Sequence, residues 1–365
     1  MQASDRVTIA DVAGASGVGI GTVSRVINGA ANVRQATRAK VLKVIEQLAY
    51  RPSHLATALS RGTSRTVAIV VPHVTRPSAV ERLAGALAVL AERGYATIVC
   101  NVDTGSQRDQ HLAALTARHR ADGVIVMSLA LSPDHLTSFR RANVPLVTVD
   151  LAAPSVPHTV IDDVAGGRLA AEHLLALGHA RIGFIGDRAR RGLAATGGST
   201  SSERRRAGLY DALRAAGIGV DPSLTRLGPH GPASAEAMAA ELLAMPDRPT
   251  AIFAASDTQA IGVLAAADRL GVRVPRDLSV IGFDDIEPAS LLRLSTVRQP
   301  LQESGAEGAR RLCALLRGER VLPLRQVLPI EVVQRGSSGR PAGQSRQTSC
   351  RSGSHSSLNS ALEAR

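Results

Sequence analysis

The feature that most constrains the fold is a regular alternation, from residue 66 to residue 335, of short apolar runs with segments rich in alanine and leucine. We expect the runs to be strands at 67–71, 96–100, 123–127, 146–149, 182–185, 251–254 and 279–281, and the longer segments to include helices at 79–93, 164–177, 203–215, 233–244 and 257–270. Such alternation is typical of parallel sheets covered by helices on both faces. Because about 270 residues is long for one core, we expect two doubly wound subdomains.

A second feature is a pair of short helices in VTIADVAGASGVGIGTVSRVIN, residues 7–28. Thr8 and Asp11 have the spacing of a capping box, and a second helix opens around Ile20 after a turn rich in glycine. Two such helices match the helix-turn-helix motif, whose second helix enters the DNA major groove. The predicted exposed face of that helix carries Ile20, Gly21, Ser24, Arg25 and Asn28.

The charge of this segment supports contact with nucleic acid. Residues 1–65 contain nine Lys or Arg against three Asp or Glu, which is half of the formal net charge of +12. A basic excess in one small domain is typical of nucleic-acid binding. In the third predicted helix, residues 34–48, we expect one face to pack (Val41, Leu42, Ile45 and Leu48) and one basic face to stay in solvent near phosphates (Arg34, Arg38, Lys40 and Lys43).

Together with NVRQATRAKVLKVIEQLAYRPSHLATAL, this stretch resembles the headpiece of the lac repressor/galactose repressor family of bacterial transcription regulators. The resemblance runs from Val7 to about Gly336 and includes AGGRLAAEHLLALGHARIGFIGD and SVIGFDDIEP. It implies an all-α headpiece (1–51), a hinge helix and linker (52–65), and an α/β effector-binding and dimerisation core (66–335). The core would consist of two doubly wound parallel-sheet subdomains of periplasmic-binding-protein type, with chain crossovers near 162, 293 and 323. Residues 336–365, rich in Ser, Gly and Arg, are expected to form a disordered basic tail.

The resemblance also implies DNA contacts, which map to Thr8, Ile20, Gly21, Thr22, Ser24, Arg25, Asn28, Ser53, His54 and Leu59. Leu59, in the short hinge helix, would wedge into the minor groove and kink the duplex, although packing within its own domain is the alternative. Ser53 departs from the Asn usual in the family, and Thr57 stands where a long polar residue is common.

Effector contacts carried over from the family map to Arg76, Asp150, Arg205, Ser256, Asp257 and Asp284. Ser256 replaces a common Asn, and Arg76-Pro77-Ser78-Ala79 replaces a phrase that resembles NPFF. With three Tyr, four Phe and no Trp in the chain, strong ring stacking on an effector is not expected. Arg76 and Arg205 favour a polyhydroxylated ligand with an acid group, but an ordinary sugar, with Arg76 paired inside the cleft, is an equal alternative. His230 is expected to be a solvent-facing loop residue.

Motifs for catalysis or metal binding are not found. Gly17, Gly19 and Gly21 follow no strand and so do not form a phosphate loop, and the adjacent Asp284 and Asp285 are expected to point apart. The sequence has no nucleophile elbow, no P-loop and no metal-spaced His cluster, and its three cysteines are scattered. We therefore expect no enzyme activity, no cofactor and no metal.

The expected protein is a cytoplasmic homodimeric regulator, most often a repressor in this family. It would bind palindromic operator DNA under the control of a small polar effector, which is a sugar, sugar acid or sugar phosphate. No apolar run approaches the roughly 18 residues that span a bilayer, and no signal-peptide pattern begins the chain, so no membrane contact is expected. The alternatives are a periplasmic-type binding protein without DNA function and an α/β enzyme.

Overall fold

The computed structural model describes residues 7–30, 32–50, 63–117, 120–188 and 200–342, which separate into two compact units. One unit contains the residues up to Thr66 and a short segment that ends at Asp122, and the other contains the rest. Ser53, His54 and Leu59, and with them the predicted hinge helix, lie outside the described residues.

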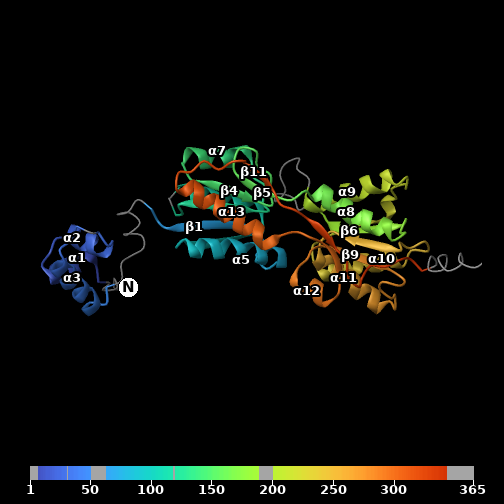
Figure 1. Cartoon of the computed structure of the whole chain (residues 1–365), viewed down its shortest axis with the longest axis horizontal. Helices are drawn as coiled ribbons and strands as arrows, with labels where there is room; N and C mark the ends of the chain where they lie inside the picture. Colours follow the sequence, from blue (N-terminus) through green and yellow to red (C-terminus); the bar gives the residue numbers. More distant parts are fainter. Residues whose placement is uncertain (1–6, 31, 51–62, 118–119, 189–199, 343–365) are drawn as a thin grey trace, which may run out of the picture. The chain divides into compact units, whose positions relative to one another are not determined.

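The first unit is a bundle of three helices, α1, α2 and α3 in Figure 1, at Ile9–Ser16, Ile20–Ile27 and Gln35–Gln47. Thr8 and Asp11 form the predicted capping box, and Gly17 ends α1 with a φ of 63°, a left-handed conformation that favours glycine. One face of each helix packs into a common core formed by Val12, Ala13, Val23, Val26, Val41, Val44 and Tyr50. The helix-turn-helix arrangement predicted from the sequence is therefore present.

The packing of α3 differs from the prediction at Leu42. Val41 and Val44 are buried, whereas the Leu42 side chain is 50% exposed. Successive residues of a helix are about 100° apart around its axis, so Leu42 lies outside the stripe that Val41 and Val44 define. Val44 takes the core position that was assigned to Leu42.

The second unit contains two six-stranded sheets, ordered β11-β5-β4-β3-β1-β2 and β12-β10-β9-β8-β6-β7. The first sheet consists of β1 (Thr66–Pro72), β2 (Ala96–Val102), β3 (Gly123–Met127), β4 (Leu146–Val149), β5 (His158–Val160) and β11 (Arg325–Val327). The second consists of β6 (Ile182–Asp187), β7 (Thr225–Gly228), β8 (Ala251–Ala254), β9 (Ser279–Asp284), β10 (Ser295–Arg298) and β12 (Glu331–Val333). Adjacent strands such as β1 and β3 or β8 and β9 run parallel, and β12 runs antiparallel to β10. The prediction of two parallel α/β subdomains is confirmed.

Helices cover these sheets as the continuous apolar strands require (Figure 1). On the first sheet, α5 (Pro77–Glu92) and α13 (Leu301–Leu316) pack together over one core. On the second, α8 (Asp163–Ala176) and α9 (Ser201–Ala215) share one core, and α10 (Pro232–Leu243) and α11 (Asp257–Arg269) share another. The other described helical elements are α6 (Gly105–Ala117), α7 (Pro133–Arg141), η1 (Pro222–Leu224) and α12 (Glu287–Leu291). No helix in the described ranges is long and apolar enough to cross a membrane.

The chain passes between the two sheets three times. It leaves the first sheet after β5 and enters the second through α8, which begins at Asp163. The return predicted near 293 lies later, because β10 still pairs with β9 and the chain leaves only at Gln299. The last crossing, predicted near 323, follows β11, which pairs with β5 through Val327. Both predictions placed the crossing before a short strand that the sequence pattern did not reveal.

The boundary predicted for the disordered tail is wrong at its first residues. Ser337 and Ser338 are buried, and Ser337 donates to the Val280 carbonyl oxygen at 2.7 Å and accepts from the Ser295 amide at 2.8 Å. Small polar side chains in this segment thus satisfy buried groups of the second sheet. Residues 343–365 lie outside the described part of the chain.

Candidate functional site

The first candidate site is the outer face of α2 in the helical unit. Val23 and Val26 are buried, whereas Ile20 is 52% exposed and Gly21 and Arg25 are also exposed. A side chain on Gly21 would come within 3.9 Å of the Arg25 guanidinium, so these two positions lie next to each other. The sequence of α2 therefore presents an apolar and a cationic group together on an accessible helix face.

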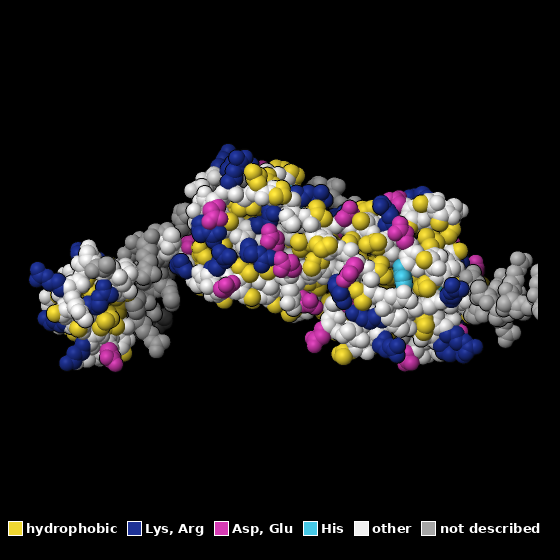
Figure 2. Space-filling model, in the orientation of Figure 1, with side chains coloured by type: hydrophobic (Ala, Val, Ile, Leu, Met, Phe, Trp, Pro, Cys, Tyr) yellow, Lys and Arg dark blue, Asp and Glu magenta, His cyan; other side chains and the backbone are white. Residues whose placement is uncertain are grey.

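The remaining predicted DNA contacts in this unit lie close to this face or serve the helix ends. Ser24 and Asn28 are half-buried and bonded to each other, with Asn28 Nδ2 3.4 Å from Ser24 Oγ. Thr22 is also half-buried, and the Thr8 hydroxyl is engaged with Asp11 in the capping box. In Figure 2, basic side chains outnumber acidic ones on the visible face of the helical unit. Such a surface attracts phosphates.

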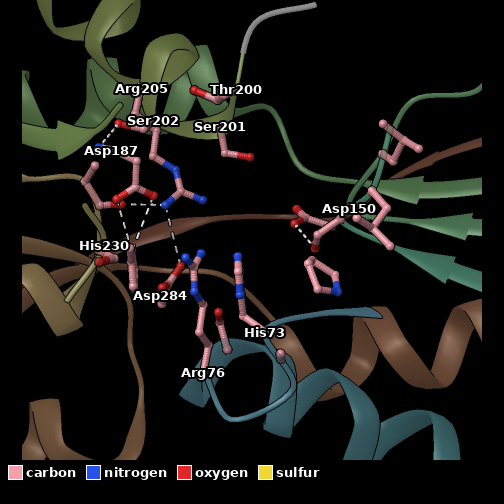
Figure 3. Close-up of a pocket in the computed structure, with 18 of the residues that line it drawn as sticks. His73, Arg76, Asp150, Asp187, Thr200, Ser201, Ser202, Arg205, His230 and Asp284 are labelled. Atoms are coloured by element: carbon pink, nitrogen blue, oxygen red, sulfur yellow. Dashed lines mark hydrogen bonds and ion pairs between the residues drawn. The ribbon is translucent and has the colours of Figure 1, made fainter. Parts of the chain in front are cut away.

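The second candidate site is a cleft of about 910 Å³ within the larger unit, lined by residues from both sheets. Figure 3 shows the labelled side chains of Arg76, Asp150, Arg205 and Asp284 converging on it. Asp150 directly follows β4 and Asp284 ends β9, as expected for ligand-binding residues of parallel sheets. Of the predicted effector contacts, the cleft lining contains these four and Ser256.

Arg205 is held rigidly at the cleft wall. Its Nε donates to Asp163 Oδ1 at 3.0 Å, its Nη1 donates to the Ala255 carbonyl oxygen at 2.6 Å, and its guanidinium carbon lies 3.5 Å from the centroid of the Phe283 ring. Burial lowers the pKa of the Arg205 guanidinium, but the carboxylates around it, chiefly Asp163, more than offset this effect and raise the pKa. Arg205 is thus a fixed, permanent cation.

The position of Arg205 depends on two glycines where α8 and α9 touch. A Cβ on Gly208 would lie 2.0 Å from the Val164 carbonyl oxygen, and one on Gly167 would lie 1.9 Å from the carbonyl oxygen of Arg205 itself. Only a residue without a side chain permits this approach. The glycine three residues after Arg205 therefore brings the guanidinium to the cleft.

Two carboxylates face the cleft from opposite lobes. Asp150 accepts from Ser128 Oγ at 2.7 Å and lies 3.1 Å from Arg82 Nη2, while Asp284 Oδ1 accepts from Gln299 Nε2 at 2.5 Å. Burial raises the pKa of Asp284, and the nearby arginines, first Arg205, partly counteract that rise. Both oxygens of Asp150 are engaged, one by Ser128 and one by Arg82, whereas Asp284 Oδ2 has no bond to these partners. A carboxylate oxygen has two lone pairs and can accept a second hydrogen bond, so both groups are suitable acceptors for a ligand hydroxyl.

Arg82 and Gln299 are functional residues that the sequence interpretation missed. Arg82 Nη2 donates to Gln299 Oε1 at 3.0 Å, and both residues are buried and line the cleft. Through Gln299 they connect Asp150 of the first lobe with Asp284 of the second. No sequence signal marked Arg82, which follows Glu81 in the otherwise mainly apolar helix α5.

Asp257 is not a cleft residue, and its predicted contact with effector is corrected. It is fully buried, and its carboxylate accepts from Thr296 Oγ1 at 2.6 Å and from the Ile286 amide at 3.0 Å. Burial raises the pKa of Asp257 well above its ordinary value. It connects α11 to the segments after β9, whereas Ser256 caps α11 and lines the cleft.

His230 was expected in a solvent-facing loop, and this prediction is wrong. Its side chain is only 14% exposed, lines the cleft and places Nδ1 3.1 Å from Asp187 Oδ1. Gln259 Nε2 donates to the same oxygen at 3.0 Å. Burial raises the pKa of Asp187, but the bond and charge of His230, together with the nearby arginines, outweigh it, so the pKa is lowered and the carboxylate stays charged. Asp187 ends β6, so the rule that placed Asp284 would also have found it.

The charge and shape of the cleft restrict the ligands that it suits. Five arginines and three aspartates are among the described residues that line it. That lining includes His73 and His230 but no Phe, Tyr or Trp, and Phe283 lies beneath Arg205. The cleft thus provides many charged hydrogen-bonding groups and no open aromatic platform.

Comparison with known proteins identifies relatives of both units. Residues 8–53 match the family of bacterial regulatory proteins described as lacI, and residues 171–338 match a periplasmic binding protein-like domain. The HTH-type transcriptional regulator DegA of Bacillus subtilis (strain 168) is 36% identical over 344 residues, which cover 91% of this chain and 98% of DegA. A lac repressor dimer bound to operator and the anti-inducer ONPF is 28% identical with a TM-score of 0.79, over 92% of this chain and 100% of that one. A transcriptional regulator CelR–cellobiose complex is 32% identical with a TM-score of 0.66, over 91% and 100%.

Proposed function

The chain belongs to the lacI family of bacterial regulatory proteins. From this we propose that it is a homodimeric repressor whose affinity for operator DNA is controlled by a polar effector bound in the cleft. It is a DNA-binding transcription regulator, as its curated relatives are. The observation that carries the proposal is the presence in one chain of an exposed recognition face on α2 and a cleft lined by arginines and aspartates. A periplasmic-type binding protein would have no use for the first of these.

The exposed face of α2 offers two kinds of contact for operator recognition, hydrogen bonds and apolar contacts. Arg25 is exposed and can donate two hydrogen bonds to a guanine edge, while Ile20 and Gly21 offer only apolar contact, for example with a thymine methyl. Residues Thr8, Thr22, Ser24 and Asn28 would contribute contacts to the backbone or bases at the edge of this face. Two headpieces on a two-fold axis would read a palindrome in the cytoplasm.

The effector that the cleft suits best is a polyhydroxylated molecule with an acid group. Asp150 and Asp284 are held in place by Arg82, Gln299 and Arg205, and their carboxylate oxygens retain lone pairs that can accept from hydroxyls. Arginines exceed aspartates in the lining, so an anionic group is favoured electrostatically. Cellobiose, bound by the similar regulator CelR, is neutral, so a neutral sugar is the second candidate.

A ligand panel tests the effector class. Sugar acids, sugar phosphates and neutral sugars would be screened by thermal shift, because a ligand of the folded state raises Tm as its concentration exceeds Kd. We expect stabilisation by an acidic member, lost in Asp284→Asn and weakened about tenfold in Arg76→Ala. Stabilisation by neutral sugars alone, undiminished in Arg76→Ala, would reject the acidic ligand and leave the regulator role intact.

Operator binding is tested separately. Random-sequence selection with the full chain would yield a palindromic site, and fluorescence anisotropy at several salt concentrations would give its affinity. Asp284→Asn is the control, since its headpiece is unchanged and it should bind the operator normally without effector. A chain that selects no sequence would overturn the proposed repressor function.

A further inference from the structure

A second concave surface lies on the outer edge of the second sheet. It is a groove of about 470 Å³, formed where β7, α9, η1 and α10 meet, and Arg188, Arg206 and Arg226 line it with Tyr210. Thr225, Leu227, Pro222, Met238 and Glu241 complete the described lining. Its position at an edge strand makes it distinct from the cleft, with which it shares only Arg188 and Leu227.

Bonds to the protein position the arginines of the groove without using all their donors. Arg226 Nε donates to Glu241 Oε2 at 2.7 Å and its Nη1 donates to the Ser223 carbonyl oxygen at 2.7 Å. Arg188 Nη2 donates to the Leu227 carbonyl oxygen at 3.2 Å. A guanidinium has five N–H groups, so each of these side chains retains donors for a ligand.

Arg206 is held in a different manner. Its guanidinium carbon lies 5.8 Å from the centroid of the Tyr210 ring, and the Tyr210 hydroxyl is fixed 2.7 Å from Thr225 Oγ1. Among the described residues, neither Arg206 nor Arg188 has a carboxylate partner, and Glu241 is the one carboxylate in the lining. Three cations therefore surround a small concavity with one compensating charge.

We propose that this groove is a second ligand site, which binds a small phosphorylated molecule. Several guanidinium groups around one concavity suit the three equivalent oxygens of a phosphate monoester. Leu227, Pro222 and Met238 provide apolar contacts for the organic part of the molecule. A groove of about 470 Å³ matches the size of a metabolite and is short for the extended backbone of a nucleic acid.

The chain offers a matched pair of variants for the test. Arg214 also lies over the Tyr210 ring, at 5.9 Å, and is on α9, but it pairs with Asp211 and does not line the groove. Arg206→Gln and Arg214→Gln therefore remove the same charge from the same helix. Arg76→Ala removes a cation from the effector cleft and reports on phosphate bound there.

The experiment measures the Tm of the full chain against inorganic phosphate at constant ionic strength, with chloride as the reference anion. We expect phosphate to stabilise the wild type, Arg214→Gln and Arg76→Ala alike, and to need about tenfold higher concentration for Arg206→Gln. No phosphate-specific stabilisation, or an equal loss in both α9 variants, would overturn the site. Loss in Arg76→Ala alone would place the phosphate in the cleft and also overturn it. If Arg206→Gln bound random duplex DNA several-fold more weakly than Arg214→Gln, the groove would be a DNA contact instead.

Discussion

Arg205 combines a structural and a ligand-binding position in one side chain. Its bond to Asp163 and its contact with Phe283 belong to the core, while its Nη1, 3.7 Å from Asp284 Oδ1, faces the cleft. Removing one member of a buried ion pair leaves the other charge uncompensated. Variants of Arg205 therefore do not isolate its role in effector binding, and the tests above use Arg76 and Asp284.

This reasoning gives a prediction for stability. Arg205→Ala should lower the free energy of unfolding by about 3 kcal/mol or more, because Asp163 would remain buried without one of its two arginines. Arg76→Ala, at a half-buried position, should lower it by less than about 1 kcal/mol. Urea denaturation of the ligand-free proteins measures both values. Equal, small losses would show that Arg204 alone compensates Asp163.

The recognition face gives a second prediction. Arg25→Ala should weaken binding to the selected operator by about 1 to 3 kcal/mol and change binding to random DNA little. Anisotropy titrations on both duplexes at equal salt measure the difference. Equal weakening on the two duplexes would assign Arg25 to a phosphate instead of a base.

At the site, the family resemblance carried over Arg205, Asp150 and Asp284 residue by residue, and all three side chains line the cleft. Their contact with an effector stays a prediction. Arg82 and Gln299 were missed because their importance arises only when α5 and the crossover after β10 come together, 217 residues apart in sequence.

At the scale of elements, the strands found from sequence are those formed by a mainly apolar run, and they include the edge strand β2. β3, β4 and β8 are buried at every residue and, apart from Thr148, apolar, and their predicted bounds agree with the structure. The missed strands β5, β7, β10, β11 and β12 have three or four residues each and contain polar side chains. Their extended form depends on a neighbouring strand to pair with, which no local pattern encodes.

The terminal segment that follows β12 gives a prediction about pH. His179 Nε2 lies 2.8 Å from the Gly339 carbonyl oxygen, and His173 Nε2 lies 2.9 Å from Ser338 Oγ. Burial lowers the pKa of both histidines below the ordinary value of 6.5. The unfolded chain then binds protons more readily, so these groups contribute stability above pH 6.5 that is lost as the pH falls toward their folded values.

We therefore expect the free energy of unfolding to decrease from pH 7.5 to pH 5.5, and His179→Gln to reduce that decrease. Urea denaturation at the two pH values measures it, with His111→Gln, on α6, as a control for the effect of a His-to-Gln substitution elsewhere in the larger unit. If His179→Gln retained the full wild-type pH dependence, this histidine would not be the responsible group.

At the scale of the whole molecule, the proposed homodimer needs an apolar surface, and the larger unit has one. Val80 and Leu87 on α5 and Ile98 on the adjoining edge strand β2 are exposed. The Glu81 carboxylate accepts from the backbone of Glu287, which brings the start of α5 to α12. There Leu291 is 80% exposed. Exposed apolar patches of this kind mark interfaces.

Leu291→Glu should raise the dissociation constant of the dimer at least about tenfold, because it places a charge in the proposed apolar interface, from which water is excluded. Leu322→Glu is the control, since Leu322 is 60% exposed next to β11, away from this patch. Analytical ultracentrifugation at micromolar concentration measures the assembly. A Leu291→Glu protein as dimeric as the control would move the interface to another surface.

The backbone conformation of the cleft residues limits which amino acids can replace them during evolution. His73, Ser128, Asp150 and Asp284 line it with φ values of 47°, 51°, 59° and 113°, in a region that β-branched residues enter only at a cost. Asn, Asp and Gly tolerate such backbone best. A descendant that evolves to bind a new effector can therefore accept few single amino-acid substitutions at these four positions. Arg76, with a φ of −69°, has no such restriction. Selection for new effectors should therefore accumulate varied replacements at Arg76 and exchange mainly small polar residues at the strand ends.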